Sequence, residues 1–464
     1  MTDLHVVILA AGKGTRMKSG RPKVLHELAG STLIDHVLDT AAALGAKSTV
    51  LVVGHEAELV RQSLSARPGL DFVIQSPQLG TGHALLQTAA LLESKPGTVL
   101  LLYADVPLLQ SNTLVRLLEQ HTNQRAAATI LTVEAPDPDG YGRIVRDHSG
   151  AVVRIVEDRD ASVAERAIHE INSGIYALDL PPLFDALRSL ATDNAQGEYY
   201  LTDLVALYHH QQLTIDTLCF ENPEELRGVN TRVDLAELGR ALLDRKRRSL
   251  MLGGVTLEDP STTYVEAGVL VGEDTIIGPG VRLTGRTSIG ARCRIHAGSR
   301  ITSSTLGDDV TVLDHCVVVE SAVEAHASIG PFAHLRPGSD VGAQARVGNF
   351  VELKKTRLGP RSKANHLAYL GDATIGADVN IGAGVITCNY DGVQKHHTLI
   401  DDGVFIGSDS QLIAPVTIGK EAYVGAGSSI TENVPPGGLA VARARQTNKE
   451  GWAASRRRAH QKKD

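Results

Sequence analysis

Aliphatic residues recur every six positions through the second half of the chain. The series begins at Val265, shortens to five residues at four points and skips thirteen residues once, before Ile400. Its members are Val265, Val271, Ile277, Leu283, Ile289, Ile295, Ile301, Leu306, Val312, Val318, Val323, Ile329, Leu335, Val341, Val347, Leu353, Leu358, Ala364, Leu370, Ile375, Ile381, Thr387, Ile400, Ile406, Leu412, Ile418, Val424 and Ile430. Neither a helix nor an alternating strand has this period. It predicts a parallel β-helix of hexapeptide repeats with roughly nine or ten coils of three hexads each; a β-sandwich with coincidental spacing is the alternative.

The first half of the chain has a different pattern, in which short apolar runs alternate with helical periodicity. The runs are residues 6–9, 49–53, 72–75, 99–103 and 127–133, and helices are expected at residues 34–44 and 84–92. This alternation is typical of βαβ units. It predicts an α/β domain with a mostly parallel, Rossmann-like sheet.

The change of pattern divides the chain into parts, since 464 residues exceed what one core usually holds. We expect a first domain over residues 1–230, a linker helix over residues 231–252, and the β-helix with a C-terminal tail over residues 253–464. The basic residues 245–248 are interpreted as a solvated face of the linker helix. The basic tail, with Arg456–Arg458, Lys462 and Lys463, is interpreted as a flexible solvated end.

Composition excludes several classes of function. The net charge of −7 gives no basic field for nucleic acid. The four cysteines, Cys219, Cys293, Cys316 and Cys388, are scattered, which predicts free thiols rather than a disulfide framework or a zinc site. The apolar segment at residues 5–11 is too short to span a membrane and lacks the basic start of a signal peptide. These features predict a cytoplasmic protein without stable membrane insertion.

A glycine-rich loop follows the first predicted strand. Residues 9–17 read Leu-Ala-Ala-Gly-Lys-Gly-Thr-Arg-Met, and Pro22-Lys23 comes soon after. Backbone N–H groups of such a turn bind phosphate oxygens, and Arg16 and Lys23 add positive charge where a triphosphate would lie. The spacing is neither a P-loop nor a dinucleotide fingerprint. A purely structural turn is the alternative for the loop by itself.

A further segment, which ends in Asp105, extends this candidate site. Asp105 follows the apolar run at residues 99–103, and the carboxyl end of such a strand is where α/β sheets bind ligands. A carboxylate there favours a cation, and Mg²⁺ prefers oxygen ligands; a helix cap before Pro107 is the alternative.

The second half also carries candidate chemistry where the six-residue series shifts phase. Residues 331–337, 348–355, 365–372, 380–383 and 388–392 are rich in cationic and amide side chains, and the last of them opens the thirteen-residue gap. His366 has Arg336, Lys354, Tyr369 and Asn389 in the surrounding segments. This set suits a phosphorylated amine substrate, whereas a lone histidine is usually structural.

Together these motifs carry a family resemblance. Gly12-x-Gly14-Thr-Arg-Met with Pro22-Lys23 resembles the signature of sugar-nucleotide pyrophosphorylases. Both motif sets, up to residues 446–452, resemble the bacterial bifunctional N-acetylglucosamine-1-phosphate uridyltransferase/glucosamine-1-phosphate acetyltransferase over essentially the full length. The departures are small: Ala104 stands where the family often has Gly, and Asn365 stands where Gly is common.

The resemblance implies roles in the first domain. Gln75 would read the pyrimidine edge, Asp105 and Asn230 would bind Mg²⁺, and Arg16 and Lys23 would act in catalysis. The residues implied in binding UTP or UDP-N-acetylglucosamine are Leu9, Ala10, Ala11, Gly12, Lys23, Gln75, Gly80, Thr81, Tyr103, Ala104, Asp105, Gly142, Glu157, Asn172 and Asn230. Gly142, Glu157 and Asn172 would hold the sugar.

For the second domain, the resemblance implies a left-handed β-helix, a homotrimer, and acetyl transfer from acetyl-CoA with His366 as general base. Glucosamine-1-phosphate would be held by Arg336, Lys354, Tyr369 and Asn380, with Asn389 helping to orient it. Acetyl-CoA would contact Ala383, Asn389, Tyr390, Ser408, Ala426 and Arg443. The product, made with UTP, would supply peptidoglycan and lipopolysaccharide-type precursors.

Two other functions remain open from the sequence. One is a pyrophosphorylase with a single activity, for example one making ADP-glucose or GDP-mannose, whose β-helix is regulatory or structural. The segment around His366 argues against it, and an acetyl-transfer assay would separate the two. The other is a non-catalytic trimeric scaffold with a vestigial nucleotide domain; retention of Arg16, Lys23, Asp105 and Asn230 argues against it, and magnesium-dependent turnover of UTP would exclude it.

Overall fold

The computed structural model describes residues 3–461, so Lys462 and Lys463 of the basic tail lie outside the described residues. Contacts divide the chain into two compact units, of which the first ends at Leu242 and the second begins at Leu243. Each unit has its own hydrophobic core, so the two are described separately. None of the described helices is long and apolar enough to cross a membrane. All four cysteines are free thiols, as predicted.

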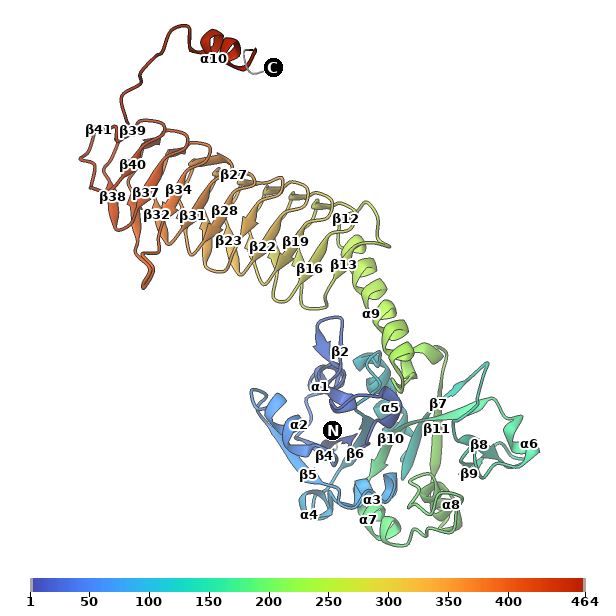
Figure 1. Cartoon of the computed structure of the whole chain (residues 1–464). Coiled ribbons are helices and arrows are strands. Elements are labelled where there is room, and N and C mark those ends of the chain that lie inside the picture. Colours follow the sequence, from blue (N-terminus) through green and yellow to red (C-terminus); the bar gives the residue numbers. More distant parts are fainter. Residues whose placement is uncertain (1–2, 462–464) are drawn as a thin grey trace. The chain divides into compact units, whose positions relative to one another are not determined.

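The first unit is built around one mixed sheet with the strand order β11-β7-β10-β6-β1-β4-β5 (Figure 1). The strands are β1 (Leu4–Ala10), β4 (Ser48–Val53), β5 (Leu70–Ile74), β6 (Thr98–Tyr103), β7 (Ala128–Glu134), β10 (Glu170–Asp179) and β11 (Ile215–Phe220). The pairs β6/β1, β1/β4, β4/β5 and β7/β11 are parallel, whereas β10 runs antiparallel between β6 and β7. A hairpin of β8 (Arg143–Arg146) and β9 (Val152–Val156) joins β10. The predicted α/β class and mostly parallel sheet are thus confirmed.

Helices cover both faces of this sheet, which explains why its central strands are apolar throughout. On β1, Val6 and Ile8 pack in one core and Val7 and Leu9 in the other. The helices are α1 (Leu33–Ala42), α2 (Ala57–Ser63), α3 (Thr81–Leu86), α4 (Ala89–Leu92), α5 (Ser111–Gln124), α6 (Val163–Arg166), α7 (Leu180–Arg188) and α8 (Asp203–His210). The helix expected at residues 84–92 is interrupted between α3 and α4. There the buried hydroxyl of Thr88 donates to the carbonyl of Leu85 (2.7 Å).

The expected linker helix is present as α9 (Arg232–Leu252), preceded by Thr231, whose hydroxyl accepts from the N–H of Asp234 (3.2 Å). Within the first unit, Leu238 is fully buried in a small core with Met17, Leu28 and other residues. The first half of α9 therefore packs as part of the first unit.

The interpretation of residues 245–248 as a solvated face is wrong for Lys246 and Arg247. Lys246 Nζ donates to the carbonyls of Ala267 (3.0 Å) and Val269 (2.6 Å), and Arg247, 7% exposed, donates to the carbonyl of Thr263 (2.8 Å). The physical reason is that carbonyls at the start of a solenoid have no preceding coil to pair with. Desolvation lowers the pKa of Lys246. The two cations thus cap the first coil.

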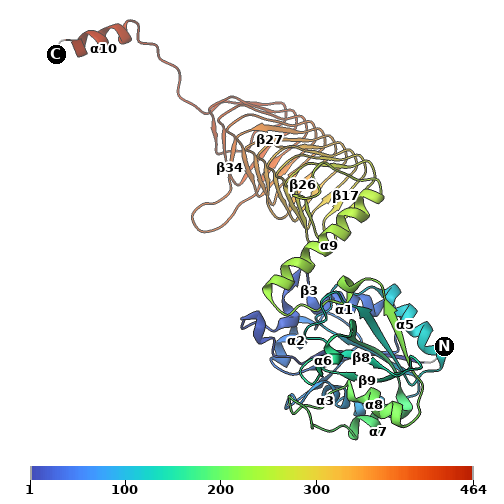
Figure 2. The same ribbon diagram turned by 90° about the vertical axis from the view of Figure 1, so that its right-hand side faces the viewer.

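The second unit is a solenoid of three parallel sheets (Figures 1 and 2). Among the described residues, the eleven-stranded face runs from β12 (Thr256–Leu257) to β41 (Leu439–Ala440). The ten-stranded face runs from β13 (Tyr264–Val265) to β40 (Ser429–Ile430), and the nine-stranded face from β14 (Leu270–Val271) to β38 (Val416–Ile418). Each strand pairs with the equivalent strand of the next coil, as in Ile277 with Ile295. The predicted hexapeptide β-helix of about ten coils is confirmed.

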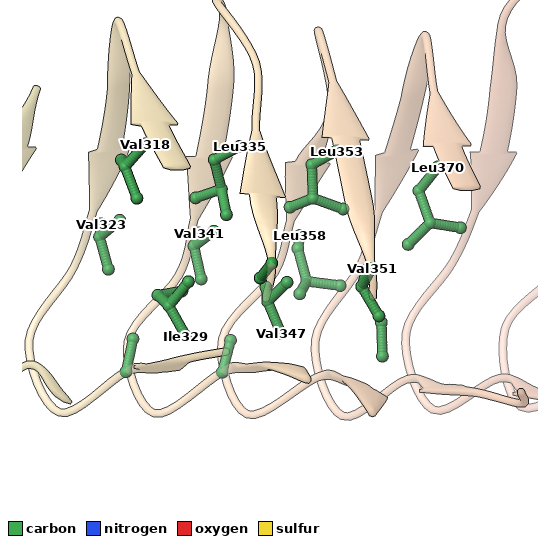
Figure 3. Close-up of a cluster of buried hydrophobic side chains, with 14 of the residues drawn as sticks. Val318, Val323, Ile329, Leu335, Val341, Val347, Val351, Leu353, Leu358 and Leu370 are labelled. Atoms are coloured by element: carbon green, nitrogen blue, oxygen red, sulfur yellow. The ribbon is translucent and has the colours of Figure 1, made fainter. Parts of the chain in front are cut away.

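The six-residue series forms the core of this solenoid. Every member is buried except Val271, which is half-buried against the same core. Figure 3 shows part of the column, with Val318, Leu335, Leu353 and Leu370 stacked along one face. Close stacking of branched side chains on successive coils gives a close-packed interior, which explains why the series tolerates so few polar members. Thr387 is one, and its hydroxyl is satisfied by the N–H (2.7 Å) and carbonyl (3.0 Å) of Gly371.

A second inward-facing set, of Ser and Thr residues, was not anticipated from the sequence. These hydroxyls donate to carbonyls of the next coil, as in Thr275 to Gly290 (2.9 Å), Ser299 to Leu313 (2.9 Å) and Ser362 to Gly376 (2.7 Å). They satisfy polar atoms at the corners, which would otherwise be costly to bury.

Two features interrupt or end the solenoid. A loop follows β34 (Ile386–Cys388) and projects from the coils (Figure 2), where the six-residue series has its thirteen-residue gap. Beyond β41 the chain continues to a short exposed helix, α10 (Trp452–Gln461), which carries Arg456–Arg458.

Candidate functional sites

The glycine-rich loop borders a cavity of about 460 Å³ in the first unit. Its lining residues are Leu9, Ala10, Ala11, Gly12, Lys13, Lys23, Val24, Gln75, Gln78, Gly80, Thr81, Ala84, Tyr103, Asp105 and Glu198. Ten of the residues that the resemblance assigned to nucleotide binding are among them, although they come from four separate segments. Strands β1 and β6 are parallel neighbours, so their carboxyl ends bring the glycine loop and Asp105 to the same edge of the sheet.

The loop needs glycine at Gly14, where φ is 60° and a β-carbon would lie 2.6 Å from the β-carbon of Lys23. This close approach lets Lys23 pass beside the loop and reach the cavity. Gly12 has open space where a side chain would stand, on the cavity side of the loop. The loop therefore presents its backbone to whatever occupies the cavity.

Charged and amide side chains converge at the end of β6. Lys23 Nζ forms an ion pair with Asp105 and lies 3.3 Å from Oδ1 of Asn230. Arg16 donates to the same Asn230 oxygen at 2.9 Å. Asp105 and Asn230 are far apart in the chain but are joined because Val229 donates its N–H to the carbonyl of Asp105 (2.8 Å). The structure thus brings together the four residues assigned to phosphate and metal.

The segment expected to contact the base also lines the cavity. Gln75 is 4% exposed and donates its amide to the carbonyl of Gly80 (2.8 Å). Gly80 has φ 106°, and a β-carbon there would meet the carbonyl oxygen of Tyr199 at 2.7 Å. Gln78 donates to the carbonyl of Ala11 (2.9 Å), which ties this segment to the glycine loop.

The three residues expected to hold a sugar form a separate cluster. A β-carbon on Gly142 would lie 3.6 Å from Asn172 and 3.7 Å from Glu157, and the N–H of Asn172 donates to the carbonyl of Gly142 (2.8 Å). Desolvation raises the pKa of Glu157, although a hydrogen bond from Thr202 (3.0 Å) partly opposes the shift. Burial, with the charges of Glu157 and Asp105, likewise raises the pKa of Tyr103 well above its usual value.

Three further residues near these sites are Ala104, which was predicted to bind the nucleotide, and Glu198 and Arg143, which were not assigned a role. Ala104 is buried and does not line the cavity, so its side chain packs in the core. Glu198 lines the cavity but lay in no recognised motif. The buried Arg143 donates to Asp158 (3.1 Å) and to the carbonyl of Tyr141, so it holds the sugar segments together. Its position directly after Gly142, which the resemblance assigns to sugar binding, was the signal that could have revealed it.

In the solenoid, the predicted cations lie at the ends of strands on the ten-stranded face. Arg336 follows β25 (His334–Leu335) and donates to Glu352 in β28 (Glu352–Lys354) at 2.8 Å. On the next coil, Tyr369 pairs with Glu352 in the backbone register. Glu352 was not anticipated. It lies 17 residues before Tyr369, on the preceding coil. Counting back one coil from Tyr369 in the sequence would have identified it.

The carboxylate of Asp372 links Lys354 and Asn389, two residues that were predicted to contact the substrate. Asp372 Oδ2 lies 3.3 Å from Lys354 Nζ and accepts a hydrogen bond from the amide of Asn389. Lys395, in the projecting loop, lies beside Lys354, and a hydrogen bond with Lys354 and the repulsion of its charge lower the pKa of Lys395. Neither Asp372 nor Lys395 had been assigned a role. The arrangement places two amines and an amide around one carboxylate, a set suited to a phosphate and its sugar.

His366 ends β30 (Lys363–His366) and is exposed. Its Nδ1 lies 2.6 Å from Oδ1 of Asn349, the last residue of β27 (Arg346–Asn349). The two residues are register partners on adjacent coils. The imidazole therefore has one nitrogen bonded to the protein and the other, Nε2, left for a ligand.

The residues assigned to acetyl-CoA follow one corner of the solenoid. Ala383, Ser408 and Ala426 each come two residues after a strand of the eleven-stranded face. They lie on adjacent coils, because a β-carbon on Gly382 would meet the N–H of Ser408 at 2.5 Å. Arg443 continues the row beside Gly427. Asn380 lies in β33 (Asn380–Ile381), before the corner, and Tyr390 is in the projecting loop, 60% exposed.

The described residues contain no cluster of three or more His, Cys, Asp or Glu side chains arranged to hold a metal ion. A cation at Asp105 and Asn230 would thus have two protein oxygens and would need phosphate oxygens or water for the rest, which is common for Mg²⁺.

Comparison with known proteins assigns both units. Residues 6–211 match the model of the MobA-like NTP transferase domain. Residues 264–367 match the GMPPB C-terminal domain, and residues 397–432 match six bacterial transferase hexapeptide repeats. Proteins named bifunctional protein GlmU match almost end to end. Those of Pelobacter propionicus, Koribacter versatilis and Brevibacillus brevis are 50%, 51% and 49% identical, and the alignments cover 97–99% of this chain and 98% of each relative.

The chain belongs to the GlmU family of bifunctional enzymes. It is a transferase with a nucleotidyltransferase domain followed by a hexapeptide acyltransferase domain, which carry a uridyltransferase and an acetyltransferase activity. The solenoid is the left-handed β-helix of hexapeptide repeats. The full-length matches to bifunctional proteins rule against the single-activity pyrophosphorylase and the inactive scaffold.

Proposed function

We propose that this member of the GlmU family makes UDP-N-acetylglucosamine in two steps, with the boundaries expected above: uridyl transfer in residues 1–230, a linker in residues 231–252 and acetyl transfer in residues 253–464. Glucosamine-1-phosphate is acetylated first, and the product then reacts with UTP. The observation that carries the proposal is that one chain holds both a cavity lined by the glycine loop, Lys23 and Asp105 and, on the solenoid, cationic side chains in the coils around His366.

In the acetyl step, Arg336 and Lys354 bind the sugar phosphate, and Tyr369, Asn380 and Asn389 orient the sugar. Nε2 of His366 takes the proton from the substrate amine as its nitrogen attacks the thioester carbonyl of acetyl-CoA. The carbon–sulfur bond breaks, and coenzyme A leaves as the thiol after taking up a proton. Ala383, Tyr390, Ser408, Ala426 and Arg443 line the path of the cofactor.

In the uridyl step, a phosphate oxygen of N-acetylglucosamine-1-phosphate attacks the α-phosphorus of UTP, and pyrophosphate leaves. The protein mainly positions the reactants and neutralises charge, through the glycine loop, Arg16 and Lys23. Gln75, Gly80 and Thr81 surround the base, and Gly142, Glu157 and Asn172 hold the sugar.

Asp105 and Asn230 suit a bound Mg²⁺, since an oxygen of each already contacts one cationic nitrogen, that of Lys23. When bound, Mg²⁺ would neutralise the negative charge that develops on the triphosphate oxygens. Lys23 and Arg16 would then be free to contact phosphate.

We further propose a homotrimer formed through the β-helix, located in the cytoplasm, whose product supplies peptidoglycan and lipopolysaccharide-type precursors. A row of stacked rings on one corner supports self-association: His315, Phe332 and Phe350 lie with ring centroids 5.3 Å apart at each step. The two phenylalanines are 48% and 56% exposed, a large apolar exposure for a single chain. Sedimentation equilibrium should give three chains per particle.

The decisive experiment supplies the purified protein with glucosamine-1-phosphate, acetyl-CoA, UTP and Mg²⁺. UDP-N-acetylglucosamine, coenzyme A and pyrophosphate should appear together. Omitting acetyl-CoA should abolish nucleotide-sugar formation, and N-acetylglucosamine-1-phosphate should restore it. If uridyl transfer occurs but coenzyme A is not released, the acetyl half of the proposal is wrong.

A further inference from the structure

The eleven-stranded face changes its strand length at one place only among the described residues. Its strands are two residues long except for β27 and β30, which have four and end at Asn349 and His366. The two extra residues carry the backbone pairing into the corner, where Asn349 and His366 become direct partners. The regular coil is thus modified where the candidate base lies.

Two backbone features hold this pair in place. A β-carbon on Gly348 would overlap the carbonyl oxygen of Asn365, so only glycine lets the two strands approach this closely. Beyond the pair, the N–H of Leu367 donates to the carbonyl of Asn349 (3.0 Å). The side chains of Asn349 and His366 therefore project from a closely packed segment, and the 2.6 Å contact between them follows from the register.

We propose that Asn349 is a positioning residue for acetyl transfer, which fixes the orientation and tautomer of the His366 imidazole. The amide oxygen of Asn349 accepts a hydrogen bond from Nδ1–H. That tautomer leaves the lone pair on Nε2, the nitrogen that must take the proton from the amine. With the bond reversed or lost, the ring would rotate freely and spend part of its time with Nε2 protonated, unable to act as a base.

This inference rests on the proposed role of His366 as the base, and the experiments separate the two. Steady-state acetyl transfer is measured for full-length Asn349→Ala, Asn349→Asp and Asn433→Ala. Asn433 is a matched control because its Oδ1 also accepts one hydrogen bond, from the N–H of Thr417 (2.8 Å), but on a later coil. His366→Ala tests the base itself.

Asn349→Ala should lower kcat about tenfold, the size expected of one lost hydrogen bond, with KM for glucosamine-1-phosphate nearly unchanged. Asn349→Asp keeps an acceptor for Nδ1–H, so it should retain more activity than Asn349→Ala. Its added negative charge favours the imidazolium, so the acid limb of the pH–rate profile should move to higher pH. Asn433→Ala should keep the wild-type kcat.

The tautomer itself is read from the ¹⁵N magnetic resonance spectrum of histidine-labelled protein, with the His366 signals assigned by their loss in His366→Gln. Wild type should show a protonated Nδ1 and an unprotonated Nε2 at high pH, and Asn349→Ala should show a mixture. An unchanged kcat in Asn349→Ala, or a lowered kcat with an unchanged tautomer, overturns the inference. If His366→Ala keeps acetyl transfer, the proposed base is wrong, whatever the spectrum shows.

Discussion

The ammonium of Lys23 forms an ion pair with the carboxylate of Asp105, and the same nitrogen lies 3.3 Å from the side-chain oxygen of Asn230. The Lys23 and Asp105 side chains are only 14% and 19% exposed. A pair shielded in this way interacts more strongly than one at the surface. The lysine thus occupies the position between the two oxygens where a metal ion would bind, at the edge of the nucleotide cavity.

The first prediction concerns Asp105. Asp105→Asn keeps the volume but removes the charge that attracts Mg²⁺. Uridyl transfer should fall sharply, most of all at limiting Mg²⁺, while acetyl transfer stays near normal. Asp71→Asn, at an exposed position on β5, serves as the control. The two activities are measured separately, with N-acetylglucosamine-1-phosphate supplied for the first. Unchanged uridyl transfer at limiting Mg²⁺ would exclude Asp105 as a metal ligand.

The second prediction concerns the half-buried carboxyl of Glu157, whose pKa is raised by desolvation. An acid with a higher pKa in the folded state stabilises the fold while it is protonated. Stability is therefore lost as pH rises from the unfolded value, near 4.5, through the raised folded value. Glu157→Gln removes this loss and still accepts the hydrogen bond from Thr202. Its Tm at pH 7, without ligands, should exceed that of wild type, although sugar binding weakens.

The check is thermal unfolding of both proteins from pH 4 to pH 8. The difference in Tm should grow with pH over the interval in which Glu157 ionises. Glu119→Gln, at an exposed position in α5, should follow wild type throughout. A difference that is constant with pH would mean that ionisation of Glu157 is not its cause.

The third prediction concerns His366. Loss of a positioned general base typically costs about 10²–10⁴-fold in rate. His366→Ala should lose acetyl transfer by that factor and keep uridyl transfer from supplied N-acetylglucosamine-1-phosphate. The residual acetyl rate should rise with pH, since more of the substrate amine is then unprotonated. Near-normal acetylation at pH 7 would make His366 structural and direct attention to Tyr369 or a bound water.

The fourth prediction concerns separation of the two activities. A fragment of residues 1–230 should keep some uridyl transfer, and one from residue 251 onward should acetylate, because each unit has its own core. A fragment of residues 1–242 should have a higher Tm than residues 1–230. It keeps Leu238, whose burial against Met17 and Leu28 is lost in the shorter fragment. If folded fragments of both units lack activity, the division is wrong.

The matching prediction for the second unit concerns its first coil. A fragment beginning at residue 243 keeps Lys246 and Arg247, which donate to the carbonyls of Ala267, Val269 and Thr263. It should therefore be more resistant to thermal unfolding than one beginning at residue 253. Equal Tm values for the two would show that these hydrogen bonds add little to the stability of the solenoid.

The architecture could be predicted from the sequence because its determinants are local and periodic. Each hexad needs one inward aliphatic side chain, so members of the series such as Ile277 and Leu353 reveal the solenoid without any knowledge of distant contacts. Strands buried on both faces are continuously apolar, which reveals β1 and β6 in the same way. The glycine loop and Asp105 could be placed together because parallel strands present their carboxyl ends at one edge.

The side chains that hold the sites together were decided only by tertiary structure. Asn349 reaches His366, and Asp372 reaches Lys354 and Asn389, across separations of 17 or 18 residues. Such contacts depend on the register between coils, and every shift of the six-residue series from six to five changes that register. Similarly, the sequence predicts a solvated charge cluster at Lys246 and Arg247. It does not show which backbone carbonyls lack a hydrogen-bond donor from a preceding coil. The hydrophobic pattern thus determined the scaffold, while hydrogen bonding between coils decided which polar groups meet.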